Sequence, residues 1–554
     1  MRRGAAQQAP RARLALQPCH APGVEGEARC GQYEVYENRA TKAGRKIALK
    51  IVVVPALNAT PSRDPVFWLQ GGPGAAATQV AGLSNDFLTD IRQERDLVFV
   101  DQRGTGDSHP LVCDIADDPS DLSRFFGELF PAEKIRACRE QLEKNSDLKL
   151  YTTPIAMDDL DETRAALGYG KINLAAASYG TIAALVYMRQ HPAHLRAVFL
   201  LGVANTNVRQ PLPFAKGAQH ALDLLFEDCA ADNACHQAFP DLPKEFAAVM
   251  ARFEQGSVTT QLVNPTTKQA ETVKIARENF VERLRLLLYT TTFARFVPLI
   301  VHRAFENDYL PFETMAIRYN PGRGLARGMY LTVTCSESVP FITEPDIVQQ
   351  TQGTFVGAAR VRSHIAACKE WPQGAIPKSY VEPVKSNVPV LLVSGEVDAS
   401  TPPWLGKEAM QRLSNGRQVN IRYYGHQLDG PCVRTMLTEF IRNGSARSID
   451  AACTESIRRP PFALEIPGQL LFAPSSLINS KLSATVHDFL EQSCTVAESL
   501  RSSTLACDCR LVVRMRTAPT GGCDSPGSRW VTVDWSCECA RHRHRDESRR
   551  RIAE

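Results

Sequence analysis

The feature that most constrains the fold is a regular alternation of short apolar segments with helical segments over residues 46–203. Segments such as Val66–Gln70 and Leu97–Asp101 are almost continuously apolar, and turn-forming residues follow each of them. Short strands that are apolar on both faces are typical of a parallel sheet covered by helices on both sides. The pattern therefore predicts an α/β fold with a mostly parallel, doubly wound sheet. The expected strands are 32–38, 46–54, 66–70, 97–101, 171–177, 197–203, 388–394 and 419–424, and the expected helices among them are 78–92, 157–167 and 179–190.

A long insertion interrupts this alternation. From about Gln210 to Pro383 the sequence is mostly helical in character and lacks regular apolar strands. An insertion of this size on one face of a sheet often covers the active site, so we expect a helical cap domain. The expected organisation is an N-terminal extension at 1–30, a core in two parts at 31–209 and 384–466, the cap at 210–383, and a tail of unclear structure at 467–554.

Charge and hydropathy exclude two classes of partner. The formal net charge is +4 over 554 residues, without the concentrated basic patch that a nucleic-acid-binding protein needs. No stretch approaches the ~20 consecutive apolar residues of a membrane-spanning helix. We therefore expect neither nucleic acid nor a membrane-spanning segment.

The cysteines predict an oxidising compartment. Of the 16 cysteines, ten lie at or before Cys453, and no CxxC pair suggests a common zinc framework. Close spacing favours disulfides between Cys19 and Cys30 and between Cys229 and Cys235. An extracellular or periplasmic location follows, although the first residues lack the apolar region of a signal peptide.

A candidate nucleophile lies between an expected strand and an expected helix. The segment Ala176-Ala-Ser178-Tyr-Gly180 matches the G-x-S-x-G nucleophile turn, except that Ala176 replaces the first glycine. At such a sharp turn a serine hydroxyl projects above the sheet, where it can attack a substrate. The alternative interpretation is an ordinary N-cap serine of the following helix.

The partners of such a serine must follow it in the order acid, then base. Asp398 comes directly after the apolar strand 388–394, at the edge of the sheet where ligands of parallel sheets gather. Glu396 is the rival acid, but Asp398 lies further along the turn and better suits a histidine partner. His426 follows the late strand 419–424, and we predict that it is the general base of a Ser178–Asp398–His426 triad.

Two backbone N–H groups are candidates for stabilising the oxyanion of the reaction. One is the N–H of Tyr179, at the start of the helix after the nucleophile. The second is expected in Gly71-Gly-Pro-Gly74, which follows the strand 66–70. Pro73 has no N–H, so Gly72 is the better donor.

Taken together, these motifs resemble the prolyl aminopeptidases and, more closely, the exported bacterial tripeptidyl aminopeptidases of the α/β-hydrolase superfamily. The resemblance covers about residues 19–464. Three positions depart from it: Ala176, Gln70 before the glycines, and Gln427 after the histidine. The motifs are Gly71-Gly-Pro-Gly74, Asp101-Gln-Arg-Gly-Thr-Gly106 with Ser108, Ser178-Tyr-Gly180, Gly395-Glu-Val-Asp398 and Gly425-His426, with Cys30-Gly31, Glu37-Asn-Arg39 and Thr334-Cys-Ser-Glu337 favouring the second group.

The resemblance implies an extracytoplasmic serine exopeptidase that removes amino-terminal residues or short peptides and uses no metal and no organic cofactor. A peptide substrate with a free amino terminus needs a carboxylate to bind its ammonium group. Our candidate is Glu337, late in the expected cap; the alternative is a surface glutamate beside a disulfide-bonded Cys335.

Other functions remain open on the same residues. An esterase or another acyl hydrolase would use the same triad, since the acyl-enzyme chemistry is shared. Dehalogenases and epoxide hydrolases fit less well, because they use a carboxylate nucleophile where this chain has Ser178. A non-catalytic binding protein on a hydrolase fold is a third hypothesis. Labelling by a fluorophosphonate separates an enzyme from a binding protein.

Overall fold

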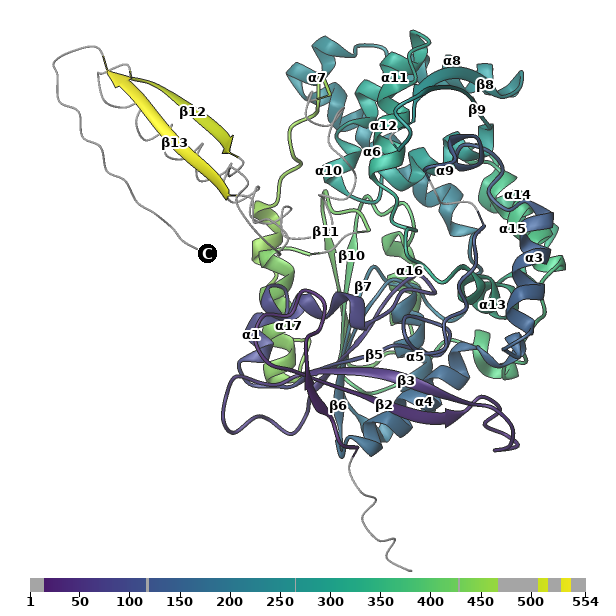
Figure 1. The fold of residues 1–554 in the computed structure, drawn as a ribbon, viewed down its shortest axis with the longest axis vertical. Helices are drawn as coiled ribbons and strands as arrows, with labels where there is room; N and C mark the ends of the chain where they lie inside the picture. Colours follow the sequence, from purple (N-terminus) through teal and green to yellow (C-terminus); the bar gives the residue numbers. More distant parts are fainter. Residues whose placement is uncertain are drawn as a thin grey trace, which may run out of the picture. The chain divides into compact units, whose positions relative to one another are not determined.

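The structure, a computed structural model, describes residues 14–115, 119–264, 266–426 and 429–466, and the backbone of 507–516 and 530–539. The chain divides into two compact units, Met1–Ala473 and Pro474–Glu554, which are described separately. The first unit contains a nine-stranded sheet in the order β1-β2-β3-β5-β4-β6-β7-β10-β11 (Figure 1). Its strands are β1 (Gln17–Cys19), β2 (Ala28–Tyr36), β3 (Lys46–Val54), β4 (Val66–Leu69), β5 (Leu97–Val100), β6 (Ile172–Ala177), β7 (Leu195–Leu201), β10 (Val390–Gly395) and β11 (Gly416–Ile421).

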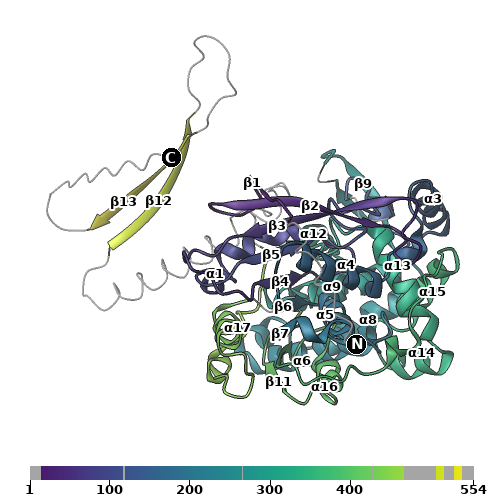
Figure 2. The same cartoon turned by 90° about the horizontal axis from the view of Figure 1, so that it is seen from below.

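The sheet is mostly parallel, as predicted. From β5 through β4, β6, β7 and β10 to β11 all neighbouring strands run parallel, whereas β1, β2 and β3 are antiparallel. Alternate residues of each strand face opposite sides, so both faces of the sheet are buried under helices. One face packs against α4 (Thr153–Ala166), α5 (Tyr179–Gln190) and α16 (Pro403–Met410), and the other against η1 (Thr78–Asn85), α1 (Thr89–Arg92) and α17 (Pro431–Asn443), as Figure 2 shows from below.

One predicted helix has a different form. The segment expected as a single helix at 78–92 is divided into the 3₁₀ helix η1 and the short α1. Gly82 lies against Gly23, and a Cβ on Gly82 would come within 3.1 Å of the Gly23 carbonyl oxygen. This close approach of two backbones replaces the side-chain packing that a regular amphipathic helix would use.

The expected helical insertion forms a second packed layer with its own apolar core. It also contains a hairpin of β8 (Val258–Val263) and β9 (Ala270–Ile275), which the sequence pattern did not predict because most of its side chains face solvent. The segment between β5 and α4, which holds α2 (Leu122–Phe125) and α3 (Ala132–Glu143), contributes Phe125 and Phe126 to this core. The helices are α6 (Pro213–Ala231), α7 (Asn233–Ala238), α8 (Leu242–Glu254), α9 (Arg277–Leu287), α10 (Thr291–Ala294), α11 (Val297–Phe305), α12 (Leu310–Arg318), α13 (Arg327–Glu337), α14 (Glu344–Thr351) and α15 (Ala359–Lys369).

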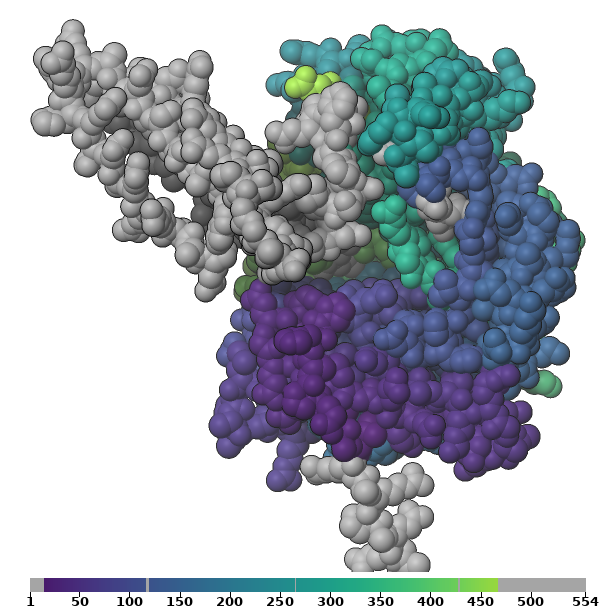
Figure 3. All heavy atoms as spheres, in the orientation of Figure 1, coloured from purple at the N-terminus to yellow at the C-terminus, as the bar shows by residue number. Residues whose placement is uncertain are grey.

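The insertion gathers at one end of the first unit, and the amino-terminal strands lie at the other (Figure 3). Within the extension that we expected at 1–30, Gln17–Cys19 form β1 and residues 28–30 begin β2, so these residues belong to the sheet. In the described part, no single helix is long and apolar enough to cross a membrane; α9 together with Thr291–Phe305 meets those criteria only as a pair bent by 119°.

Five disulfides join all ten cysteines up to Cys453. The two pairs predicted from spacing, Cys19–Cys30 and Cys229–Cys235, are both present. This pairing is consistent with a protein that folds in an oxidising compartment. The other three are Cys113–Cys138, Cys335–Cys368 and Cys432–Cys453.

The described part of the second unit is an antiparallel pair, β12 (Cys507–Arg516) with β13 (Trp530–Cys539). Its register sets Cys507 opposite Cys539 and Cys509 opposite Cys537. The remaining residues expected in the tail lie outside the described residues.

Candidate active site

Ser178 occupies a strained turn between β6 and α5. Its backbone φ of 56° and ψ of −126° are rarely adopted by residues other than glycine. Gly180 allows this turn, because a Cβ there would lie 2.2 Å from the carbonyl oxygen of Leu69 in β4. Ala176, the departure from the usual glycine, is fully buried in the sheet. The strand–turn–helix context expected of a nucleophile turn is therefore present.

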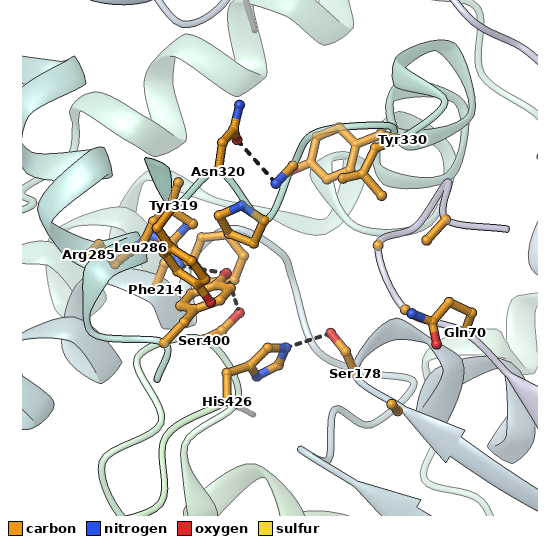
Figure 4. Close-up of a pocket in the computed structure, with 18 of the residues that line it drawn as sticks. Gln70, Ser178, Phe214, Arg285, Leu286, Tyr319, Asn320, Tyr330, Ser400 and His426 are labelled. Carbon is orange, nitrogen blue, oxygen red and sulfur yellow. Dashed lines mark hydrogen bonds between the residues drawn. The ribbon is translucent and has the colours of Figure 1, made fainter. Parts of the chain in front are cut away.

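The structure brings Ser178, His426 and Asp398 together. The Ser178 hydroxyl lies 2.9 Å from Nε2 of His426, and Nδ1 of the same ring lies 2.9 Å from Oδ2 of Asp398 (Figure 4). Asp398 follows β10 and His426 follows β11, so the carboxyl ends of neighbouring parallel strands deliver both residues. None of the described hydrogen bonds of His426 involves the rival acid, Glu396.

Asp398 is fully buried and held by three further donors. Its carboxylate accepts the backbone N–H groups of Ser400 at 2.7 Å and of Thr401 at 2.8 Å, and the Thr401 hydroxyl at 2.7 Å. Burial alone would raise the pKa of Asp398, but His426 and the bonds from Thr401 together lower it below its ordinary value. The acid therefore stays ionised.

Thr401, which contacts both Asp398 and His426, was not among the residues predicted from the sequence. Its hydroxyl oxygen also lies 3.0 Å from Nδ1 of His426, so it contacts both partners of the nucleophile. The run Asp398-Ala-Ser-Thr401 carries a signal that could have found it, because an aspartate side chain often caps the backbone two or three residues later.

The insertion holds His426 from the other side. The backbone N–H of His426 donates to the carbonyl oxygen of Tyr289 at 2.6 Å. The centroids of the two rings lie 4.8 Å apart. Gly425 permits this contact, because a Cβ there would lie 2.3 Å from the same oxygen. The Tyr289 hydroxyl accepts from Arg285 at 2.9 Å and donates to Ser400 at 3.0 Å. No local pattern marks Tyr289 in the sequence.

The predicted oxyanion loop lies directly beside the nucleophile. A Cβ on Gly71 would come within 2.9 Å of Cβ of Ser178, so only glycine fits there. Gly72 has a φ of 113°, a conformation that favours glycine. Tyr179 is the first residue of α5, and the first N–H groups of a helix have no acceptor within it. Both candidate donors thus belong to segments that flank Ser178.

A cavity of about 500 Å³ opens above Ser178 and His426. Figure 4 shows these two residues at its floor, with Phe214, Tyr319 and Tyr330 of the insertion above them. Its charged lining residues in the described part are Glu282, Arg283, Arg285, Arg327, Arg360 and Asp429.

Glu282 is the buried acid of this lining. It receives two hydrogen bonds from Arg285, at 2.9 and 2.6 Å, and lies 3.5 Å from Nε of Arg360. Burial would raise the pKa of Glu282, but the charges of Arg285 and Arg360 lower it to about 2. Glu282 is therefore ionised and already bound to arginine.

Glu337, our predicted ligand of the substrate ammonium, lies elsewhere. It is 3% exposed and is not among the described residues that line the cavity. Its carboxylate accepts the N–H of Thr153 at 2.6 Å, the Thr153 hydroxyl at 2.7 Å and the hydroxyl of Tyr380. The structure therefore does not bring Glu337 to the described lining of the cavity: this carboxylate faces the interior between α13 and α4.

Two described clusters have the residue types of a metal site. One is Cys335 and Cys368 with His364, but these sulfurs form a disulfide. The other is Asp161 with His191 and His194, where Asp161 is paired with Arg164 at 2.8 Å. Neither of these two clusters is among the described residues that line the cavity.

Comparison with known proteins agrees with the fold and the motifs. The family described as alpha/beta hydrolase fold matches residues 64–260, and the family described as TAP-like protein matches residues 353–453. The serine protease Hip1 of Mycobacterium tuberculosis is 23% identical over 488 residues, 78% of this chain and 88% of that protein. The tripeptidyl aminopeptidase of Streptomyces lividans is 24% identical over 487 residues, 81% of this chain and 88% of that protein.

A shorter match links the chain to a proline iminopeptidase of Neisseria gonorrhoeae, which is 28% identical over 144 residues, 26% of this chain and 34% of that protein. The chain is thus a serine hydrolase with the α/β-hydrolase fold, similar to the tripeptidyl aminopeptidases. The resemblance predicted from its motifs is confirmed.

Proposed function

We propose that the protein is an extracytoplasmic serine peptidase that releases short peptides or single residues from the amino terminus of peptide substrates. The observation that carries this proposal is the hydrogen-bonded series Ser178–His426–Asp398 at the floor of a cavity roofed by the insertion. The names of the similar proteins, a serine protease and a tripeptidyl aminopeptidase, support the peptide as substrate.

In the proposed reaction, the Ser178 oxygen attacks the scissile carbonyl while Nε2 of His426 takes its proton. Asp398 keeps the other ring nitrogen protonated and stabilises the imidazolium that forms. The N–H groups of Tyr179 and Gly72 donate to the oxyanion of the tetrahedral intermediate. The imidazolium then protonates the leaving amine, and water hydrolyses the acyl-enzyme by the same steps in reverse order.

The exopeptidase mode rests on the cavity. The insertion covers Ser178, so a chain end enters more easily than the middle of a long chain. An amino terminus needs a carboxylate partner, and the carboxylates that line the described cavity are Glu282 and Asp429. Glu282 is buried and bound through both oxygens to Arg285. Asp429 is exposed, lines the cavity and lies three residues beyond His426. From this exposure and position, Asp429 is the proposed ligand of the ammonium group.

Three measurements test this proposal. A fluorophosphonate should label the wild type and not Ser178→Ala, because the label reacts with the activated serine. Free-amino tripeptide p-nitroanilides should be cleaved, and their amino-acetylated forms should not. Asp429→Asn should raise KM for the free-amino peptides about fivefold, the equivalent of about 1 kcal/mol for an exposed ion pair, with little change for p-nitrophenyl acetate.

The outcomes are distinct. Activity of Ser178→Ala above a tenth of wild type would overturn the nucleophile assignment. Equal cleavage of acetylated and free peptides would overturn the exopeptidase mode, and hydrolysis of esters without any peptide cleavage would identify an esterase.

A further inference from the structure

Glu337 joins four segments of the molecule at one buried point. It is the last residue of α13 in the insertion, and it accepts both donors of Thr153, the first residue of α4. It also accepts the hydroxyl of Tyr380, in the segment that returns from the insertion to β10. The fourth segment is α5, because the Thr153 hydroxyl oxygen lies 2.7 Å from the hydroxyl of Tyr179. All four side chains are buried.

The donors and acceptors fix the direction of this chain of hydrogen bonds. An ionised carboxylate can only accept, so the single hydroxyl proton of Thr153 points to Glu337. The Thr153 oxygen is then free to accept, and the Tyr179 hydroxyl must donate to it. The series therefore runs from Tyr179 to Thr153 to Glu337, and its last bonds are charge-assisted, which makes them about twice as strong as neutral ones.

The first member of the series is next to the nucleophile. Tyr179 directly follows Ser178 and contributes the N–H that the proposed reaction directs at the oxyanion. Its side chain, 2% exposed, points away from the cavity toward Thr153. A residue whose hydroxyl is anchored in this way has little freedom to tilt, and its N–H keeps a constant direction.

We propose that Glu337 is a positioning residue for the oxyanion donor: through Thr153 it anchors the Tyr179 side chain to the insertion and thereby holds the Tyr179 N–H. The proposal rests on the proposed acyl-transfer chemistry at Ser178 and is independent of whether the substrate is a peptide or an ester. In this role Glu337 does not contact the substrate, so its replacement should lower kcat rather than raise KM.

The ionisation of Glu337 gives this role a pH signature. Burial raises the pKa of Glu337 to about 7, against the lowering by the bonds from Tyr380 and Thr153. The titratable groups that face it in the described structure are the phenols of Tyr380 and Tyr179, whose pKa values are raised above their ordinary range by burial and by Glu337 itself.

Protonation of Glu337 would let the series reverse. The new carboxyl proton can point to the Thr153 oxygen, Thr153 can then donate to Tyr179, and the Tyr179 hydroxyl can turn to Oε1 of Gln102, 3.4 Å away. All bonds are then neutral and the last one is long. The anchor should therefore be tighter above pH 7 than below it.

The test uses p-nitrophenyl acetate, whose hydrolysis needs the oxyanion donor but no amino terminus. Glu337→Gln keeps the shape of the side chain and removes its charge, and Thr153→Val keeps the branched shape of the side chain while a methyl group replaces the hydroxyl that links to Tyr179. The matched control is Glu245→Gln, a buried glutamate of the insertion that is bonded to His302 and lies outside the cavity and the series.

We expect kcat of Glu337→Gln and of Thr153→Val to fall about tenfold at pH 8, with KM within twofold of wild type, because a displaced oxyanion donor weakens transition-state stabilisation. The double variant should lose no more than either single variant, since both act through one series. The ratio of wild-type to Glu337→Gln kcat should shrink as pH falls through about 7, because the wild-type carboxyl becomes neutral too. Glu245→Gln should keep wild-type kcat.

Unchanged kcat in both Glu337→Gln and Thr153→Val would overturn the proposal, and so would additive losses or a ratio independent of pH. A rise in KM for free-amino peptides alone would restore the substrate-contact interpretation. These failures differ from failure of the proposed function, in which Ser178→Ala itself would keep its activity. If Glu337→Gln does not fold, Thr153→Val still tests the link from the other side.

Discussion

Replacement of Asp398 by asparagine should reverse the tautomer of His426. One carboxylate oxygen, Oδ1, accepts the N–H groups of Ser400 and Thr401, so the amide oxygen of asparagine must take that place. The amide nitrogen then occupies the place of Oδ2, 2.9 Å from Nδ1 of His426. An N–H directed at Nδ1 requires that nitrogen to be unprotonated, which moves the ring proton to Nε2. A protonated Nε2 cannot take the proton of Ser178.

The expected cost follows from this geometry. The nucleophile, the oxyanion donors and the cavity remain, but the base is lost, and in a serine protease triad the same change lowers kcat roughly 10⁴-fold. That factor corresponds to about 5.5 kcal/mol of transition-state stabilisation. The assay is kcat on a free-amino tripeptide p-nitroanilide at saturation and pH 8, with circular dichroism and Tm to verify the fold.

The control is Glu396→Gln, which removes the rival acid two residues away and should keep wild-type kcat. The reasoning would be refuted if Asp398→Asn kept more than a hundredth of wild-type kcat, or if Glu396→Gln caused the loss instead. Thr401→Val adds a graded test, because it removes one hydroxyl that holds the acid, 2.7 Å away, and leaves the tautomer unchanged; a loss of about tenfold is expected.

Three more predictions follow from particular contacts. Gly425→Ala should abolish activity, because the new Cβ would lie 2.3 Å from the Tyr289 carbonyl oxygen and would displace His426, the proposed base; kcat with a Tm control measures this. Loss of the Cys335–Cys368 disulfide by double replacement with alanine should lower the free energy of unfolding by roughly 4 kcal/mol, because it closes a loop with a sequence separation of 33; denaturant titration measures this. Folding raises the pKa of Glu337 from 4.5 to about 7, so the native state binds more protons than the unfolded state between these values, and the stability that Glu337 contributes should fall as pH rises through that window. A Tm–pH profile in which Glu337→Gln shows the same fall as wild type would contradict this assignment.

The juxtaposition of the three proposed catalytic residues could be predicted from the sequence because the fold places them by a local rule. Ser178, Asp398 and His426 each come just after an apolar strand, and the carboxyl ends of parallel strands converge at one edge of the sheet. Knowledge of the strand order was not needed to see that they could meet. The same rule identified the glycine loop after β4, whose first glycine proves to lie against Ser178.

The contacts made by the insertion could not be predicted in the same way. Tyr289 reaches His426 across 137 positions of the chain through a carbonyl oxygen, which no residue type reveals. The sequence singles out Glu337 as a candidate ligand of the substrate ammonium group. A sequence pattern does not distinguish a glutamate that binds an ammonium ion from one that accepts hydrogen bonds at the end of a buried helix. Only the position of α13 relative to α4 separates them, and helix packing in an irregular insertion has no short-range signature.

Glu337 also shows how the insertion and the nucleophile turn depend on each other. A fully buried carboxylate without a cationic partner among its described contacts costs stability above pH 7, so packing alone would favour glutamine at this position. The same charge strengthens the bond from Thr153 to Glu337, the last link of the series that anchors Tyr179. Residues at active sites often trade stability for geometry in this way. We therefore expect Glu337→Gln to have a higher Tm than wild type at pH 8 and a lower kcat. A variant that lost stability and activity in parallel would instead mark Glu337 as a purely structural residue.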